Sequence, residues 1–175
     1  MANELLTEQA AQDEMFVEDD DESGQADKFL LFNLGDEVYG INIAHVTEII
    51  EMQKITDVPD MPSFIKGVIN LRGRVIPVMD LRLRFQMSER EYDDRTCIII
   101  ANMGTTSMGF IVDTVAEVHD IGEAEIEPSP SFKDADARSN YISGLGKVGE
   151  RVTILIDVLR LLSDRQTDEV ATKLE

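Results

Sequence analysis

Cysteine, histidine and long apolar runs are scarce in this chain of 175 residues, and each scarcity excludes a class of protein. The single cysteine, Cys97, excludes an internal disulfide, and its place in an apolar strand expected at 95–101 predicts a buried, unreactive thiol. The two histidines, His45 and His119, have no second ligand at the spacing of a metal site. No apolar run approaches the ~18 residues that a membrane span needs, and no basic segment precedes an apolar stretch as in a secretory signal. We therefore expect a cytoplasmic protein without a metal, a cofactor or direct membrane insertion.

Basic residues are few and unevenly placed along the chain. The formal net charge is -19, and residues 1–27 hold ten acidic side chains and no Lys or Arg, whereas the other 148 residues hold 25 acidic and 16 basic side chains. Residues 18–22 are all acidic and repel one another, so we expect a disordered acidic tail at 1–27, and a polar tail at 164–175. Because no basic patch offsets this charge, nucleic acid is not expected as a partner.

Motifs for catalysis are also missing. No serine lies in a G-x-S-x-G elbow, and nothing else pairs a nucleophile with a base and an oxyanion donor. Residues 144–149 read G-L-G-K-V-G, but a strand is expected next, whereas a dinucleotide site needs a helix there. The sequence therefore predicts that the protein is not an enzyme.

A repeated stretch organises the rest of the chain. Residues 64–85 hold two apolar runs around a tight polar turn at 70–74, which predicts a β-hairpin followed by a short helix. A shift of 77 positions aligns residues 141–162 with this stretch without a gap. Five positions are expected to be structural turns or helix caps: Gly67, Gly73, Asp80, Gly144 and Asp157.

A second alignment, at a shift of 69, places residues 99–118 on residues 30–49. Both halves thus have the same order of hairpin, short strand, loop, hairpin and capped helix, so we interpret the chain as two copies of one β-rich unit. The predicted fold is mostly β, with two small barrels, short helices and a C-terminal helix. We expect a first barrel at about 28–85 and a second at about 95–163, with segments free to exchange between them. A groove between the halves would be a natural binding site.

Two charged residues within apolar runs are not explained by folding. Glu48 follows an apolar strand segment and Arg72 lies at the tip of the first repeated hairpin, where the second copy has Gly149. An exposed surface pair is the simple interpretation, but the repeat does not require Arg72, which favours a charged contact on a binding face.

The quoted stretches resemble a known family. F-L-L-F-N-L-G-D-E-V-Y-G-I at 29–41, V-T-E-I at 46–49 and F-I-K-G-V-I-N-L-R-G-R-V-I-P-V-M-D-L-R at 64–82 closely resemble the CheW family of bacterial chemotaxis coupling proteins, over residues 28–163. The resemblance implies two SH3-like β-barrel subdomains. It also implies a non-enzymatic adaptor in membrane-associated receptor arrays, which joins the cytoplasmic tips of methyl-accepting chemoreceptors to the regulatory domain of the histidine kinase CheA. The positions that match the family's partner contacts are Val46, Glu48, Arg72, Cys97, Ile98 and Val118.

Two alternatives remain open at this point. One is a CheW-like adaptor of a pathway that controls pili or development instead of flagella. The other is a small enzyme with an acidic cleft, which would need facing carboxylates with perturbed pKa values.

Overall fold

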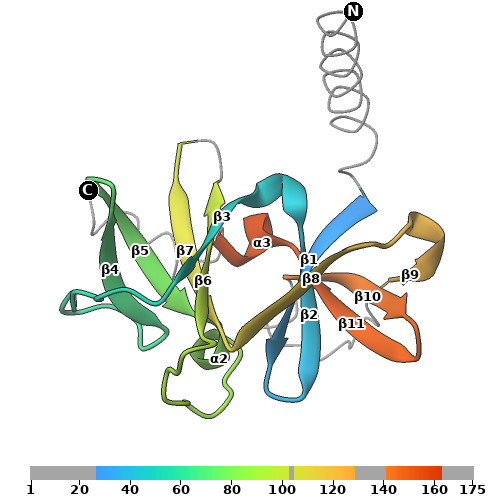
Figure 1. Ribbon diagram of the computed structural model, residues 1–175, viewed down its shortest axis with the longest axis horizontal. Helices are drawn as coiled ribbons and strands as arrows, with labels where there is room; N and C mark the ends of the chain where they lie inside the picture. The colour runs from blue at the N-terminus through green and yellow to red at the C-terminus, as the bar shows by residue number, and fades with distance from the viewer. Residues whose placement is uncertain (1–26, 103–104, 129–140, 163–175) are drawn as a thin grey trace, which may run out of the picture.

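The computed structural model describes residues 27–102, 105–128 and 141–162. The polar tail expected at 164–175, and all of the acidic tail expected at 1–27 except Asp27, lie outside the described residues. No helix in the described residues is long and apolar enough to cross a membrane. The mostly β class with a few short helices is confirmed (Figure 1). The helical segments are η2 (Ile43–His45), α2 (Leu81–Arg84), η3 (Glu123–Glu125) and α3 (Val158–Leu162).

The strands form two separate sheets, which fit the two SH3-like subdomains (Figure 1). The six-stranded sheet has the order β8-β1-β2-β11-β10-β9 and the five-stranded sheet the order β3-β6-β7-β5-β4. The strands of the six-stranded sheet are β1 (Lys28–Leu34), β2 (Glu37–Asn42), β8 (Thr114–Asp120), β9 (Ile126–Glu127), β10 (Ile142–Val148) and β11 (Arg151–Ile156). The strands of the five-stranded sheet are β3 (Val46–Glu51), β4 (Ile65–Leu71), β5 (Arg74–Asp80), β6 (Cys97–Asn102) and β7 (Ser107–Val112).

The two sequence copies exchange their first hairpins. The hairpin β1–β2 of the first copy joins β8 to β11 of the second, while β6–β7 of the second copy joins β3 to β5 of the first. Each exchanged hairpin meets its host through a parallel pairing, β2 with β11 and β7 with β5. Each sheet is therefore built from strands of both sequence copies, 28–85 and 95–163. Both hairpins carry the same apolar pattern, so local sequence does not choose the host.

Buried side chains fall into three clusters that follow this division. One cluster belongs to the five-stranded sheet and includes Ile69, Ile98 and Ile111. A second belongs to the six-stranded sheet and includes Leu31 and Leu155. The third and largest lies between the sheets and draws on both, as well as on α2 and α3. Apolar burial thus holds each sheet together and also joins the two sheets.

Two of the five structural positions do not lie in turns. Gly67 and Gly144 lie within β4 and β10, each at a register shift that marks a β-bulge. A Cβ on Gly67, whose φ is +145°, would lie 2.1 Å from the carbonyl oxygen of Thr56, and one on Gly144 would lie 2.9 Å from that of Glu127. Glycine is required there because a neighbouring backbone approaches closely, not because the chain reverses.

The other three positions have the expected geometry. Gly73 lies in the two-residue turn between β4 and β5 with a φ of +84°. The side chain of Asp80 accepts hydrogen bonds from the backbone N–H groups of Arg82 and Leu83 and so caps α2. Its counterpart Asp157 accepts from Leu159 N at 3.0 Å at the start of α3. These caps satisfy N–H groups that have no partner within the helix.

Candidate functional site: an ion pair at a sheet edge

Glu48 and Arg72 form a bidentate ion pair. Arg72 Nη1 donates to Glu48 Oε2 at 2.9 Å, and Nη2 donates to Oε1 at 2.8 Å. Glu48 comes from β3, an edge strand of the five-stranded sheet, and Arg72 from the hairpin tip at the opposite edge of that sheet. The side chain of Arg72 remains 72% exposed and that of Glu48 25% exposed. The pair therefore spans the two edges of one sheet and still presents a guanidinium to solvent.

Arg72 occupies a backbone conformation that a long side chain rarely adopts. Its φ is +52° and that of Gly73 is +84°, as a two-residue type I′ hairpin turn requires at both positions. Gly73 N also donates to the side-chain oxygen of Asn70 at 2.9 Å. The equivalent residue of the second hairpin, Gly149, has a φ of +62° without the steric cost of a Cβ. An arginine kept at a position suited to glycine is typical of a residue with a role beyond the turn.

The ion pair keeps both groups charged. The hydrogen bond from Arg72 lowers the pKa of the Glu48 carboxyl, and the bond to Glu48 raises the pKa of the Arg72 guanidinium. In the described part of the chain, the other carboxylates with a shifted pKa, Asp93, Asp113 and Glu127, are also shifted downward. A general acid needs the opposite shift, so these carboxylates are suited to ion pairing rather than proton transfer.

Exposed apolar residues recur at equivalent positions of the two copies. Ile49 on β3 is 43% exposed and Val118 on β8 is 47% exposed, and a shift of 69 positions relates them. Both strands are at the end of their sheet and pair with one neighbour only. An exposed apolar residue on an edge strand is a suitable contact for a protein partner.

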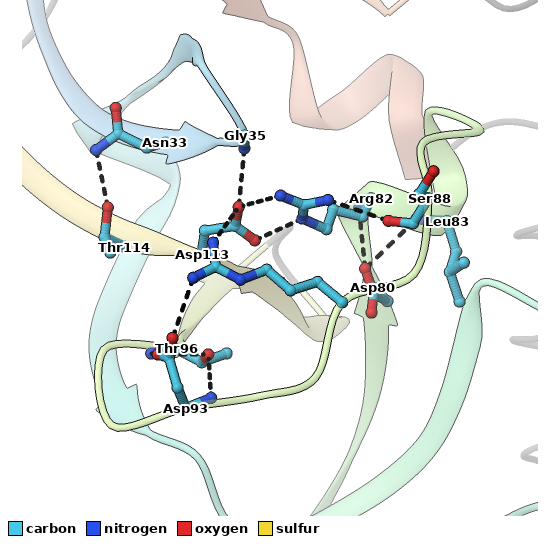
Figure 2. Close-up of polar contacts among 11 residues, drawn as sticks. Asn33, Gly35, Asp80, Arg82, Leu83, Ser88, Asp93, Thr96, Asp113 and Thr114 are labelled. Carbon is cyan, nitrogen blue, oxygen red and sulfur yellow. Dashed lines mark hydrogen bonds and ion pairs between the residues drawn. The ribbon is translucent and has the colours of Figure 1, made fainter.

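A second polar cluster, which the sequence analysis missed, surrounds Asp113 (Figure 2). Arg82 donates from Nε to Asp113 Oδ1 at 2.7 Å and from Nη2 to Oδ2 at 2.6 Å. Gly35 N and Arg90 Nη1 also donate to Oδ2, at 2.8 and 3.3 Å. Burial by itself would raise the pKa of Asp113, but the bonds from Arg82 and Gly35 and the charges of Arg82 and Arg90 outweigh it and lower that pKa.

Arg82 and Asp113 share one sequence signal with Arg72: their charge has no counterpart in the other copy. Arg82 aligns with Leu159 of the second copy, and Asp113 aligns with Ala44 of the first. Neither charge is therefore part of the repeated pattern. The described residues hold no group of three or more His, Cys, Asp or Glu side chains placed to bind a metal ion.

Comparison with known proteins identifies the family. Residues 28–166 match the CheW-like domain family. The chain belongs to the CheW family. The chemotaxis protein CheW of Klebsiella aerogenes is 42% identical over 139 residues, which make up 79% of this chain and 83% of that protein. Protein FrzA of Myxococcus xanthus is 34% identical over 110 residues, 63% of this chain and 69% of that protein. The crystal structure of the scaffolding protein TtCheW from Thermoanaerobacter tengcongensis matches with a TM-score of 0.73 at 36% identity, over 80% of this chain and 94% of that chain.

Membership of the CheW family makes this protein a chemotaxis scaffold, in a family of adaptors rather than enzymes. The family contacts expected from the sequence occupy different environments in the structure. Val46 is half-buried against the cluster between the sheets, while Val118 is exposed on the other sheet. Cys97 is half-buried at the start of β6, opposite Glu51, and its thiol donates to the Arg95 carbonyl oxygen.

Ile98 does not fit a role in partner contact. Its side chain is 0% exposed and packs in the cluster of the five-stranded sheet. Successive residues of a strand face opposite sides, so Cys97 packs against the cluster between the sheets and Ile98 against that of the five-stranded sheet. The partner contact expected at Ile98 stays a prediction, and its side chain is not exposed to make one.

The thiol of Cys97 is only partly buried, which corrects the expectation of a buried thiol. Desolvation is the main cause that raises its pKa, so the thiolate is disfavoured at neutral pH. An unreactive thiol remains the expectation.

Proposed function

We propose that this CheW-family protein joins the cytoplasmic tips of methyl-accepting chemoreceptors to the regulatory domain of the histidine kinase CheA. It would act in the cytoplasm, at membrane-associated arrays, and without chemistry of its own. Family membership supports the adaptor role. The two partners are proposed from the resemblance of the sequence motifs, and Glu48 with Arg72 is the observation in this chain that carries the proposal.

Three properties make the Glu48–Arg72 pair a suitable contact. Arg72 is held in a bidentate geometry, so little side-chain freedom remains to be lost when a partner binds. Its guanidinium is still largely exposed, and Ile49 places an exposed apolar side chain on the same strand as Glu48. We include Val46, Cys97 and Val118 in the proposed partner-binding surfaces.

The proposed mechanism is a coupling of binding free energies. The receptor would bind one surface of the protein and the kinase another. The state of the receptor can change the binding of the kinase only if the two receptor states differ in how they contact the protein between them. A rigid two-sheet body with contacts on both sheets can do this, since a partner on one sheet then restricts the placement of a partner on the other.

The test is co-sedimentation of the protein with a receptor cytoplasmic fragment and CheA from the same source, with kinase activity followed in parallel. Arg72→Glu should raise the dissociation constant for at least one partner roughly 10-fold or more, because it places two like charges side by side and removes the guanidinium. Lys147→Glu is the matched control: Lys147 is an exposed base 2.8 Å from Glu127 on the other sheet. Equal affinities of both variants for both partners would contradict the proposed site.

One alternative pathway is favoured by a specific observation. The chain is also similar to FrzA, a relative that does not carry the chemotaxis name. If the wild-type protein binds neither chemoreceptor nor CheA, the same assay with the other chemosensory kinases of the source organism would identify an adaptor of a different array.

A further inference from the structure

The chain passes between the two sheets at few points, and one of them is a single residue. β7 of the five-stranded sheet ends at Val112, and β8 of the six-stranded sheet begins at Thr114. Asp113 is the only residue between them. Its side chain is 10% exposed, so the carboxylate at this crossing is largely removed from water.

The carboxylate of Asp113 receives hydrogen bonds from both sides of the crossing (Figure 2). Gly35 N, in the β1–β2 turn of the six-stranded sheet, donates at 2.8 Å. Arg82 is the second residue of α2, the helix that directly follows β5 of the five-stranded sheet, and it donates through two nitrogens at 2.7 and 2.6 Å. Both oxygens of one carboxylate are thus bonded, and the donors come from elements attached to different sheets.

Neighbouring bonds hold the two partners in place. Asp113 N donates to the Asn33 carbonyl oxygen at 3.1 Å, and the Asn33 side chain donates to Thr114 Oγ1 at 2.8 Å. Arg82 Nη1 donates to the Ser88 carbonyl oxygen at 3.0 Å, which fixes the guanidinium from the side away from Asp113. The side chain of Arg82 is only 14% exposed.

The apolar cluster between the sheets does not make these bonds redundant. Hydrophobic contact is non-directional and tolerates a small rotation of one packed surface on another. A bidentate arginine–carboxylate pair is directional, since both N–H···O bonds require the guanidinium and carboxylate planes to be aligned. The cluster therefore accounts for the association of the sheets, and the Arg82–Asp113 pair adds a directional restraint.

We infer that Arg82 and Asp113 are positioning residues that set the relative orientation of the two sheets, and that they thereby determine how strongly a partner on one sheet is coupled to a partner on the other. The second half of this statement rests on the proposed adaptor function, and the first half does not. Neither residue lies among the proposed partner contacts, so loss of the pair should change coupling without removing a contact.

The orientation is tested by pulsed electron paramagnetic resonance with one spin label on each sheet. Val75 on β5 and Val152 on β11 are 68% and 52% exposed and occupy equivalent positions of the repeat. Both are replaced by labelled cysteine in a Cys97→Ser background, which removes the chain's own thiol. This measurement needs no partner protein.

Asp113→Asn should broaden or shift the distance distribution between the labels, and Arg82→Lys should do the same although it retains the positive charge, because it loses the fork geometry. If Asp113→Asn fails to fold, the distance distribution of Arg82→Lys alone tests the inference. Glu127→Gln is the matched control, since it breaks the Glu127–Lys147 pair, which lies within the six-stranded sheet alone. A distribution unchanged in folded Arg82→Lys and Asp113→Asn proteins would overturn the inference.

The coupling is tested in the receptor and kinase assay. In Asp113→Asn and Arg82→Lys proteins, the dissociation constant for each partner alone should stay within about 2-fold of wild type, while receptor control of kinase activity falls about 5-fold or more. Unchanged receptor control would overturn the coupling role. Wild-type protein that binds neither partner would instead refute the proposed function and leave the label distances as a separate result.

Discussion

Gly67→Ala should strongly destabilise the fold, because two independent features of the structure oppose a side chain at this position, its backbone conformation and the close approach of Thr56. The φ of Gly67 is +145°, which L-residues with a Cβ rarely adopt. An added Cβ would lie 2.1 Å from Thr56 O and 2.8 Å from Thr56 C, both of them backbone atoms that cannot rotate away. Thr56 would have to move away from β4.

The expected cost follows from what this movement breaks. Thr56 and Val68 exchange two backbone hydrogen bonds, of 2.8 and 2.9 Å, which form the isolated bridge beside β4. The loss of both costs about 1–3 kcal/mol, and backbone strain adds about 1–3 kcal/mol. We therefore expect the free energy of unfolding to fall by about 2–6 kcal/mol, which corresponds to a melting temperature lower by about 4–24 °C for a domain of this size.

Urea denaturation and thermal melts of three glycine variants separate the causes. Gly73→Ala has positive φ but nothing within 4 Å of the new Cβ, so it should cost only the strain of the turn, about 1–2 kcal/mol. Gly122→Ala has open space and a φ of -73°, so its unfolding free energy should stay the same or rise by up to about 1 kcal/mol. If Gly67→Ala costs no more than Gly73→Ala, the close approach of Thr56 is not what requires glycine in β4.

Two further predictions concern buried residues. Ile98→Ala should lower the free energy of unfolding by about 2–5 kcal/mol in denaturant titrations, because it leaves a cavity in the core of the five-stranded sheet. The folded variant should bind both partners with wild-type affinity. A loss of affinity for one partner only would show that Ile98 takes part in that contact. Asp113 should make stability depend on acid pH. Its pKa is lowered in the folded state from an ordinary value of 3.8, so its contribution is complete well above pH 4 and is lost as pH falls through the folded pKa. Denaturant titrations from pH 6 to pH 3 should therefore show a shallower loss for Asp113→Asn than for wild type, and parallel curves would contradict this assignment.

Much of the architecture could be predicted from the chain because it depends on neighbours in sequence. The alignment at a shift of 77 positions identified the hairpins and the caps at Asp80 and Asp157, which depend on turn chemistry and on a side chain two or three residues from its partner. The charge of Arg72 without a counterpart in the second copy marked it as a candidate partner contact, and the structure adds its bond with Glu48, 24 positions away. Arg82 and Asp113 also lack charged counterparts, but only the tertiary structure shows that they form an ion pair.

Other features depend on which surfaces meet, and pattern alone could not decide them. The family resemblance predicts a partner contact at Ile98, whereas its side chain is buried in the core of its sheet. The sequence predicts a turn or cap at Gly67, but glycine is required there because the carbonyl of Thr56, eleven positions earlier, closely approaches the strand. Both depend on the approach of segments whose distance in space has no signature in local spacing.

By itself, the sequence determined the two copies of the β-rich unit, their hairpins and capped helices, and the charged residues that the repeat does not account for. The tertiary structure decided that each copy gives its first hairpin to the other, and that Asp113 lies where the chain crosses between the sheets. The physical reason is that both hairpins have the same alternation of apolar residues and could pair equally well with either copy. The choice between the two hosts depends on how the connecting segments at 43–45 and 113 direct the chain, and on the bonds that Arg82 and Gly35 make to Asp113 after it has crossed.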